Sequence, residues 1–420
     1  MSQKSTRYPY IHMLPITHKR PSPTPLQLML LMILVGLNLR PALSSLAPLL
    51  PRIASEGEFS VLTLSLLTTL PVLCLGLFAP LAPWLARRLG LERSLALGLI
   101  FLSAGLALRG IVSAPTLYLG TLLAGAAIGI VGTLLPALLK RDLTASADLM
   151  TGVYTMALCL GGALGAGLSI PLAHWLNSWS LSLMSWSSFA LIALFAWWWV
   201  MPQPIAEQWS KTQQNHTRAL LSNPLAWQVM LLMGSQSSLA YIVFGWLPTL
   251  LVQQGYNESE AGWLMSASIL IQLVSAISAP WLARLARDQR PALMFALSLV
   301  GAGLLILLLG PTSLRWLGVT LLGLGQGGSF SLALTLIVLR SGDSKIAGEL
   351  SALVQGGGYT LAAMGPLLVG LMLDAAMSIQ TITWVLMAIL TFAASMGLLA
   401  GRQRRLETHT NGTLITVVHS

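Results

Sequence analysis

The sequence predicts an all-α membrane protein with twelve transmembrane helices in two pseudo-symmetric six-helix bundles. Of its 420 residues, 55% are hydrophobic and 9% are charged, and the mean hydropathy is +0.76, which excludes a water-soluble protein. Twelve apolar stretches are long enough to cross a hydrocarbon core ~30 Å thick, which needs roughly 20 helical residues. A six-residue sequence also recurs 197 positions later, which indicates two related halves.

The first bundle is predicted over residues 26–200. Each of its helices is a predominantly apolar run, because backbone groups inside lipid must be hydrogen-bonded within the segment. Trp197, Trp198 and Trp199 end the sixth run, where tryptophans anchor a helix at the lipid headgroups. The six helices are Leu26–Leu50, Ser60–Leu85, Ser94–Val112, Thr116–Leu139, Leu149–Ala173 and Leu181–Val200.

The second bundle is predicted over residues 226–401, after a polar cytoplasmic linker at 201–225. A basic tail (1–25) and a carboxyl-terminal tail (402–420) complete the chain. The first apolar run is too long for the core of a cleaved signal peptide. The helices of the second bundle are Ala226–Val252, Glu260–Ala283, Ala292–Gly310, Arg315–Leu339, Gly348–Leu373 and Gln380–Ala400.

Positive charge marks one side of this predicted bundle. Of 23 lysines and arginines, 19 fall in the tails and in the loops on the side of the amino terminus. The opposite side has Arg52, Arg109 and Arg315, and Arg40 lies inside the first helix. Because basic loops stay in the cytoplasm, we expect both termini there, in a multi-pass protein of the bacterial plasma (inner) membrane. The net charge of +10 then reflects topology, and no nucleic-acid partner is expected.

Internal repetition supports two halves of common origin. Ala82-Pro83-Trp84-Leu85-Ala86-Arg87 recurs letter for letter as Ala279-Pro280-Trp281-Leu282-Ala283-Arg284. The basic residues that end the fourth helix, Lys140-Arg141, have a counterpart in Arg340 at the end of the tenth, which follows Arg141 by 199 residues. Duplication of one six-helix unit explains both correspondences.

Two six-helix repeats joined by a cytoplasmic linker resemble the major facilitator transporters, whose substrate site lies near the membrane midplane between the halves. The sequence Leu85-Ala86-Arg87-Arg88-Leu89-Gly90 is similar to the signature loop of that superfamily. The resemblance implies that Arg87, Arg88 and Gly90, with Arg284 in the second half, belong to gating loops between the halves. Arg87 replaces the acidic residue of the signature, so the usual charge relay is not expected.

The chain from Leu26 to Gly401 also resembles the cyanate and 2-nitroimidazole transporter (CynX/NimT) family. This resemblance implies a secondary active transporter that carries a small planar anionic or electron-rich solute by alternating access. The first helix is more similar to the cyanate branch, and the Pro224–Gly262 region to the 2-nitroimidazole branch, so the solute stays open. The matching motifs are Asn38-Leu39-Arg40-Pro41, Leu67-Thr68-Thr69-Leu70-Pro71, Glu92-Arg93-Ser94, Lys140-Arg141-Asp142, Pro224-Leu225-Ala226-Trp227-Gln228, Gly245-Trp246-Leu247-Pro248 and Gly255-Tyr256.

Arg40 is the strongest candidate for binding the solute. At 1.5 Å per residue it lies ~21 Å along the first helix, near the midplane. A charge there costs at least ~2.5–3.5 kcal/mol, so it should face a cavity or a partner. No acidic residue lies in the middle of any predicted span, which leaves the guanidinium for a ligand with planar oxygens. Pro41 removes a backbone donor, and we expect a kink beside the charge.

Uncharged residues within the spans are weaker candidates for substrate binding, because amides in membranes often only join helices. By their spacing, we expect Gln236 to share a helix face with Tyr241, and Gln355 with Tyr359. From the amides and aromatic residues within the spans, which also include Gln272, Gln326 and Tyr154, we select Asn38, Gln236, Tyr241, Trp246, Gln355 and Tyr359 as candidates besides Arg40.

No cluster of catalytic or metal-ligand residues lies within a span, so we expect no enzyme activity, no metal and no cofactor. The expected partners are a small-molecule substrate and membrane lipid, and the expected functional unit is a monomer. A proton relay normally needs a carboxylate or histidine deep in the membrane, and this chain has none there. We therefore expect either symport of a proton carried on a weakly acidic solute or passive exchange, with efflux coupled through Glu349 or His174 as a further alternative. The alternative function is broad-specificity efflux of drugs, in which Arg40 would matter little.

Overall fold

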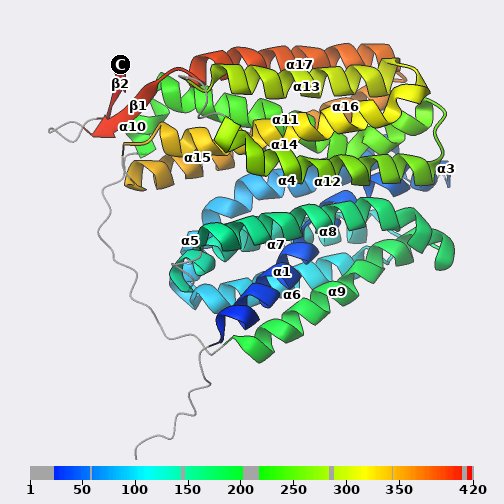
Figure 1. The fold of residues 1–420 in the computed structure, drawn as a ribbon. Coiled ribbons are helices and arrows are strands. Elements are labelled where there is room, and N and C mark those ends of the chain that lie inside the picture. The colour runs from blue at the N-terminus through cyan, green and yellow to red at the C-terminus, as the bar shows by residue number, and fades with distance from the viewer. Residues whose placement is uncertain are drawn as a thin grey trace, which may run out of the picture.

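The computed structural model describes residues 23–56, 59–142, 147–201, 217–282, 288–342, 344–408 and 414–418. Within that part of the chain, twelve helical segments are long and apolar enough to cross a membrane, which confirms the predicted count. Figure 1 shows them side by side, with the first half of the chain below and the second half above. The described part of the chain begins and ends at one end of this bundle, called here the terminal end, and the opposite end is called the far end.

The first half consists of helices of very different lengths, because its first two spans are divided into shorter segments. Its elements are α1 (Pro25–Leu39), α2 (Pro41–Ser44), a 3-10 turn η1 (Ala47–Leu49), α3 (Leu50–Ser55), α4 (Val61–Phe78), a 3-10 turn η2 (Ala79–Leu81), α5 (Ala82–Leu89), α6 (Leu91–Leu108), α7 (Ala114–Asp142), α8 (Ala147–Trp175) and α9 (Trp179–Val200).

The second half adds a short helix in the linker region and a β-hairpin after the last span, neither of which the sequence predicts. Its elements are α10 (Thr217–Leu221), α11 (Pro224–Gln253), α12 (Glu258–Leu282), α13 (Arg290–Leu309), a 3-10 turn η5 (Thr312–Leu314), α14 (Arg315–Leu339), α15 (Ser344–Ala362), α16 (Met364–Asp374), α17 (Ile379–Ala400), β1 (Arg404–Thr408) and β2 (Leu414–Val418).

The first span breaks where proline predicts a kink. Helix α1 ends at Leu39, Arg40 caps it, and α2 starts at Pro41, which has no N–H to continue the helical hydrogen bonds. The broken segment packs on glycines of α8. A Cβ atom at Gly165 would lie 2.9 Å from the Cα of Pro41, and one at Gly161 would lie 2.9 Å from the Cα of Leu37. Glycine is therefore required for this close approach of two backbones.

The two halves touch from the far end of the bundle to its middle. On one side, α8 contacts α12, and the Ser266 hydroxyl donates to the Ala163 carbonyl at 2.9 Å. On the other side, α4 contacts α15 and α16, and a Cβ atom at Gly76 would lie 2.9 Å from the Gly356 carbonyl oxygen. At the terminal end, α5 packs on α6 and α7 of its own half.

The predicted tail at 402–420 contains an antiparallel hairpin that closes the terminal end of the second half. Strands β1 and β2 pair with Arg404 opposite Val418, and Leu406 is fully buried. The Leu406 N–H donates to the Arg340 carbonyl at 2.8 Å. The Arg340 guanidinium, itself buried, donates to the Ala400 carbonyl at 2.9 Å and to Gln289 Oε1 at 2.6 Å. Burial lowers the pKa of Arg340 to about 10, so the residue keeps its charge at neutral pH.

We expect Gly165→Val to destabilise the protein by about 1–3 kcal/mol, because the added methyl groups must displace the backbone of Pro41. Thermal unfolding of the purified protein measures the change. Gly348→Ala is the matched control: among the described residues, nothing lies within 4 Å of a Cβ atom at that exposed helical glycine. Equal unfolding temperatures for the two variants would contradict the close packing of α2 on α8.

Candidate functional site

Arg40 occupies the midpoint of the first span, Pro25–Ser55. Its backbone carbonyl accepts hydrogen bonds from the N–H groups of Leu43 and Ser44 at 2.9 and 3.1 Å, which fixes the backbone on the far side of the break. Its side chain is half-buried, and the guanidinium carbon lies 5.4 Å from the centre of the Phe244 ring, within cation–π range. Among the described residues, no hydrogen bond or ion pair joins this guanidinium to a protein group.

The stem of Arg40 lies where the halves meet. A Cβ atom at Gly162 of α8 would lie 3.4 Å from the Cβ of Arg40 and 3.4 Å from the Cγ2 of Ile269, which belongs to α12 of the other half. Phe244, under the guanidinium, belongs to α11 of that other half. The charge therefore stands at the interface between the two halves.

Aromatic side chains from both halves surround the charge. The Tyr241 ring lies 6.1 Å from the Tyr359 ring in an edge-to-face contact and 6.2 Å from Phe244. Tyr154 of α8 adds a ring from the first half, since a Cβ atom at Gly36, four residues before Arg40, would lie 3.2 Å from the Cδ2 of Tyr154, and Phe244 lies against the guanidinium itself. Two sequence candidates, Tyr241 and Tyr359, thus come together with Arg40.

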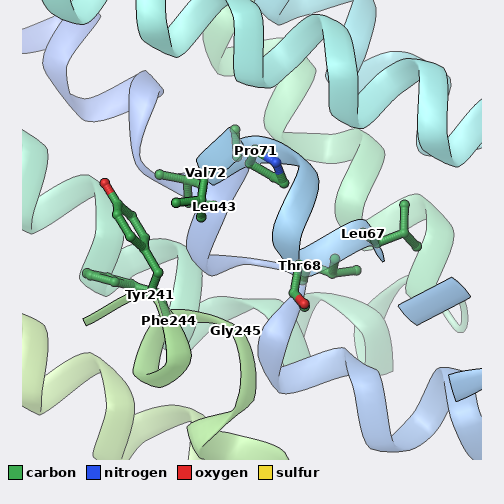
Figure 2. A pocket seen from close by; sticks show the side chains of 10 residues that line it. Leu43, Leu67, Thr68, Pro71, Val72, Tyr241, Phe244 and Gly245 are labelled. Carbon is green, nitrogen blue, oxygen red and sulfur yellow. The ribbon is translucent and has the colours of Figure 1, made fainter. Parts of the chain in front are cut away.

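Phe244 is not among the site residues predicted from the sequence, although the sequence contains a signal for it. Phe244 follows Tyr241 by three residues, so the two rings share one face of α11. Their side chains are 5% and 7% exposed and stand next to each other in Figure 2. Without knowledge of which face of α11 meets the first helix, the sequence alone does not select Phe244.

A small cavity adjoins the aromatic cluster, and Figure 2 shows it between the two halves. Thr68 is a polar residue of its wall, and the Thr68 hydroxyl is already used, because it donates to the Ser65 carbonyl at 2.9 Å. The cavity volume of about 10 Å³ holds no more than one water molecule. The wall consists of Ala42, Leu43, Leu46, Leu67, Thr68, Pro71, Val72, Tyr241, Phe244 and Gly245.

The three amide candidates have partners within their own helices. The Asn38 side chain donates to the Leu34 carbonyl at 2.7 Å, and Gln355 donates to the Ser351 hydroxyl at 2.7 Å. Gln236 donates to the Ser237 hydroxyl at 2.7 Å and does not line the cavity beside Tyr241. Five residues turn a helix by about 500°, which leaves Gln236 and Tyr241 about 140° apart rather than on one face.

Trp246 lies away from the cavity and stabilises a second helix break. Its indole N–H donates to the Pro366 carbonyl at 2.8 Å, and its side chain is 2% exposed. Pro366 belongs to α16, which is separated from α15 by the single residue Ala363. Trp246 thus joins α11 to the interrupted eleventh span, and among the described residues no hydrogen bond or ring contact connects it with Arg40.

The predicted gating residues lie at the terminal end. Arg87 and Arg88 are exposed, and the Arg88 guanidinium lies 5.4 Å from the centre of the Trp84 ring. Gly90 ends α5 with φ of 87°, a conformation that a residue with a side chain adopts only with strain. Arg284 lies outside the described residues.

Comparison with known proteins agrees with this architecture. The family model of the Major Facilitator Superfamily matches residues 28–366. A 2-nitroimidazole transporter of Escherichia coli (strain K12) is 35% identical, over 90% of this chain and 95% of its own length. The cyanate transport protein CynX of the same strain is 33% identical, over 80% and 87%. An uncharacterized transporter of Bacillus subtilis (strain 168), YycB, is 36% identical, over 89% and 93%.

Solved structures share the fold at low sequence identity. The nucleoside transporter NupG superimposes with a TM-score of 0.74 and 14% identity, over 89% of this chain and 99% of that one. A D-xylose–proton symporter superimposes with a TM-score of 0.70 and 14% identity, over 90% and 96%. From the family model and from relatives that match most of its length, the chain belongs to the major facilitator superfamily and, within it, to the family of cyanate and 2-nitroimidazole transporters.

Proposed function

We propose that this transporter carries a small planar solute, anionic or electron-rich, that binds the guanidinium of Arg40 between the two halves. The observation that carries the proposal is the position of that charge. It lies at the midpoint of a membrane span, beside a cavity lined from both halves, and among the described residues it has no carboxylate partner. A charge in such surroundings is costly unless it serves a ligand or a water-filled path.

The chemistry of the site favours planar oxygen or nitrogen acceptors. A guanidinium offers several N–H donors in one plane, which match two acceptor atoms of a carboxylate, a nitro group or a small anion. Phe244 holds one face of the guanidinium by a cation–π contact, so the N–H groups at its edge stay available. Cyanate and 2-nitroimidazole, named for two relatives, are both small solutes of this electron-rich kind.

Transport would proceed by alternating access. The halves touch from the far end to the middle, and the cavity beside Arg40 has room for about one water molecule. We place both termini in the cytoplasm of a bacterium and the protein in its plasma membrane, which makes this a state closed toward the outside. Rocking of the two halves of a monomer would enlarge the cavity and expose Arg40 to each side in turn.

The distribution of titratable groups favours a proton that travels on the solute. Among the described helices, acidic residues and histidine lie toward the ends of the spans, with Glu260 at the start of α12, Asp374 at the end of α16 and His174 at the end of α8. A relay through the protein would need such a group near the middle. We therefore propose that the gradient of the solute, with any proton bound to it, drives transport.

Replacement of Arg40 tests the binding role. In proteoliposomes, we expect Arg40→Ala to raise the KM for the transported solute by about 10- to 150-fold, which corresponds to a lost charged hydrogen bond of about 1.5–3 kcal/mol. The KM of Arg40→Lys should lie between those of the wild type and Arg40→Ala, because an ammonium group lacks the planar arrangement of N–H donors that a guanidinium has. The panel contains cyanate, 2-nitroimidazole, a short carboxylate and a bulky cationic dye.

Arg402→Ala, at an exposed arginine of the terminal end, is the control and should leave KM unchanged. Uptake of the dye that is indifferent to Arg40→Ala would instead assign broad drug efflux to this protein.

The aromatic ring of Phe244 should contribute to solute binding, because it contacts the guanidinium of Arg40. We expect Phe244→Leu to raise KM about 2- to 30-fold, since a cation–π contact contributes about 0.5–2 kcal/mol, and Phe244→Tyr to stay close to the wild type. Initial uptake rates over a range of solute concentrations measure this. Equal KM values for the Leu and Tyr variants, both different from the wild type, would show that packing rather than the ring matters.

An imposed pH gradient tests the energy source. If the proton travels on a weakly acidic solute, an alkaline interior should stimulate its uptake, and Glu349→Gln and His174→Gln should respond as the wild type does. The measurement is initial uptake with and without the gradient at fixed membrane potential. A variant that still transports the solute but no longer responds to the gradient would show that the protein itself relays the proton.

A further inference from the structure

A second arginine lies behind the wall of the cavity. Arg109 caps the far end of α6, on the side of the membrane to which the charge pattern assigns it, and its side chain is 1% exposed. Its Nη1 donates to the carbonyl oxygen of Ala42 at 2.8 Å. Ala42 lies two residues after Arg40 and lines the cavity. The bond therefore reaches the short segment that carries the binding charge.

The break of the first span creates the need for this donor. The last helical hydrogen bond of α2 runs from the Ser45 N–H to the Pro41 carbonyl. The next carbonyl, that of Ala42, comes where the helix has ended and the chain turns toward η1. An unsatisfied carbonyl inside a membrane is costly, and the guanidinium of Arg109 takes the place of the missing backbone donor.

The close approach of α6 and α7 lets the arginine reach this point. A Cβ atom at Gly120 of α7 would lie 3.3 Å from the Cγ of Arg109, so any larger side chain there would press on its stem. The position at the carboxyl end of α6 suits a positive charge, because the free carbonyls of a helix end are negative.

Stability alone does not explain a charged residue here. Nε and Nη2 of Arg109 are buried, and neither has a hydrogen-bond partner among the described residues. Transfer of a guanidinium from water into the protein costs free energy, and a hydrogen bond from only one of its three nitrogens does not offset that cost. Apolar side chains of similar volume often make the folded state at least as stable. The hydrogen bond to Ala42 therefore has a function other than stabilising the folded state, one that apolar packing could not provide.

We propose that Arg109 is a positioning residue for transport: by fixing the carbonyl of Ala42 it holds the break between α1 and α2, and thereby the direction in which Arg40 points. The inference rests on the proposed function, since it assigns Arg109 a role through Arg40. Arg109 itself stays behind the wall and does not touch the solute.

Hydrogen exchange measures the hold on the segment directly, without any solute. In Arg109→Met, amides of residues 40–49 should exchange at least about tenfold faster than in the wild type, because the segment loses its anchor. Arg340→Met is the matched control, since Arg340 is also a buried arginine at a helix end that donates to a carbonyl, but at the terminal end. It should leave exchange of residues 40–49 within about twofold of the wild type.

Exchange of residues 40–49 that is unchanged in Arg109→Met, or equally raised in both variants, would overturn the inference. If Arg109→Met does not fold, Arg109→Lys replaces it. Lysine keeps a single donor nitrogen but lacks the planar guanidinium. We therefore expect the amides of residues 40–49 to exchange about threefold faster while the protein stays folded. An unchanged segment in the Lys variant would equally overturn the inference.

A double-mutant cycle then connects Arg109 with Arg40. With cyanate and 2-nitroimidazole as probes, Arg109→Met should raise KM about tenfold in the wild-type background but less than about twofold in the Arg40→Lys background. The effect should be smaller there because residue 40 no longer has a planar guanidinium whose direction must be held. The same factor in both backgrounds would mean that Arg109 acts independently, and would overturn the inference. If Arg40→Ala alone leaves uptake unchanged, it is the proposed binding role of Arg40 that is wrong. The hydrogen-exchange experiment would then still show whether Arg109 holds residues 40–49, because it uses no solute.

Discussion

A positive charge in the middle of a membrane span constrains everything around it. Arg40 sits at the point where the first span is broken by Pro41, so both a guanidinium and loosened backbone carbonyls must be accommodated in surroundings of low dielectric. The neighbouring helices accommodate both the charge and the break. Gly161 and Gly165 let α8 approach the broken segment, and Phe244 covers one face of the guanidinium from the other half.

The second half has a corresponding interruption on the other side of the site. The eleventh span breaks at Ala363, and Tyr359, one turn before the break, meets Tyr241 of α11. Buried donors hold both interruptions: Trp246 donates to the Pro366 carbonyl and Arg109 to the Ala42 carbonyl, each at 2.8 Å. Discontinuous helices of this kind mark substrate sites in transporters, because they expose polar groups at the midplane while the rest of the bundle stays apolar.

Much of the architecture follows from the sequence because lipid imposes strong rules. Length and hydropathy predict twelve spans, and Pro41 predicts the break in the first one, since each depends on a property of the segment itself. The absence of acidic residues in mid-span isolates Arg40 by the same kind of local reasoning. The β-hairpin was not predicted, because its pairing depends on Leu406 finding Arg340 and Gly342, 66 and 64 positions earlier.

The rest of the site depends on which helix faces meet, and hydropathy does not contain that information for a span that is apolar all round. Phe244 and Gln236 both lie on α11, yet one covers Arg40 and the other bonds to its own helix. Arg109 shows the same limit: the charge pattern assigns it to the far side of the membrane but does not reveal that its side chain turns inward to a carbonyl. Rotation of each helix about its axis decides these cases.

The central claim is that the guanidinium of Arg40 itself holds the solute. The most direct measurement is a crystal structure of the protein with selenocyanate, a linear anion whose selenium gives an anomalous diffraction signal. Our account predicts an anomalous peak between the halves, within about 5 Å of the Arg40 guanidinium, in contact range for a charge-assisted hydrogen bond from the anion's acceptor atom. A peak elsewhere in the bundle, with Arg40 still packed on Phe244 and free of ligand, would contradict it.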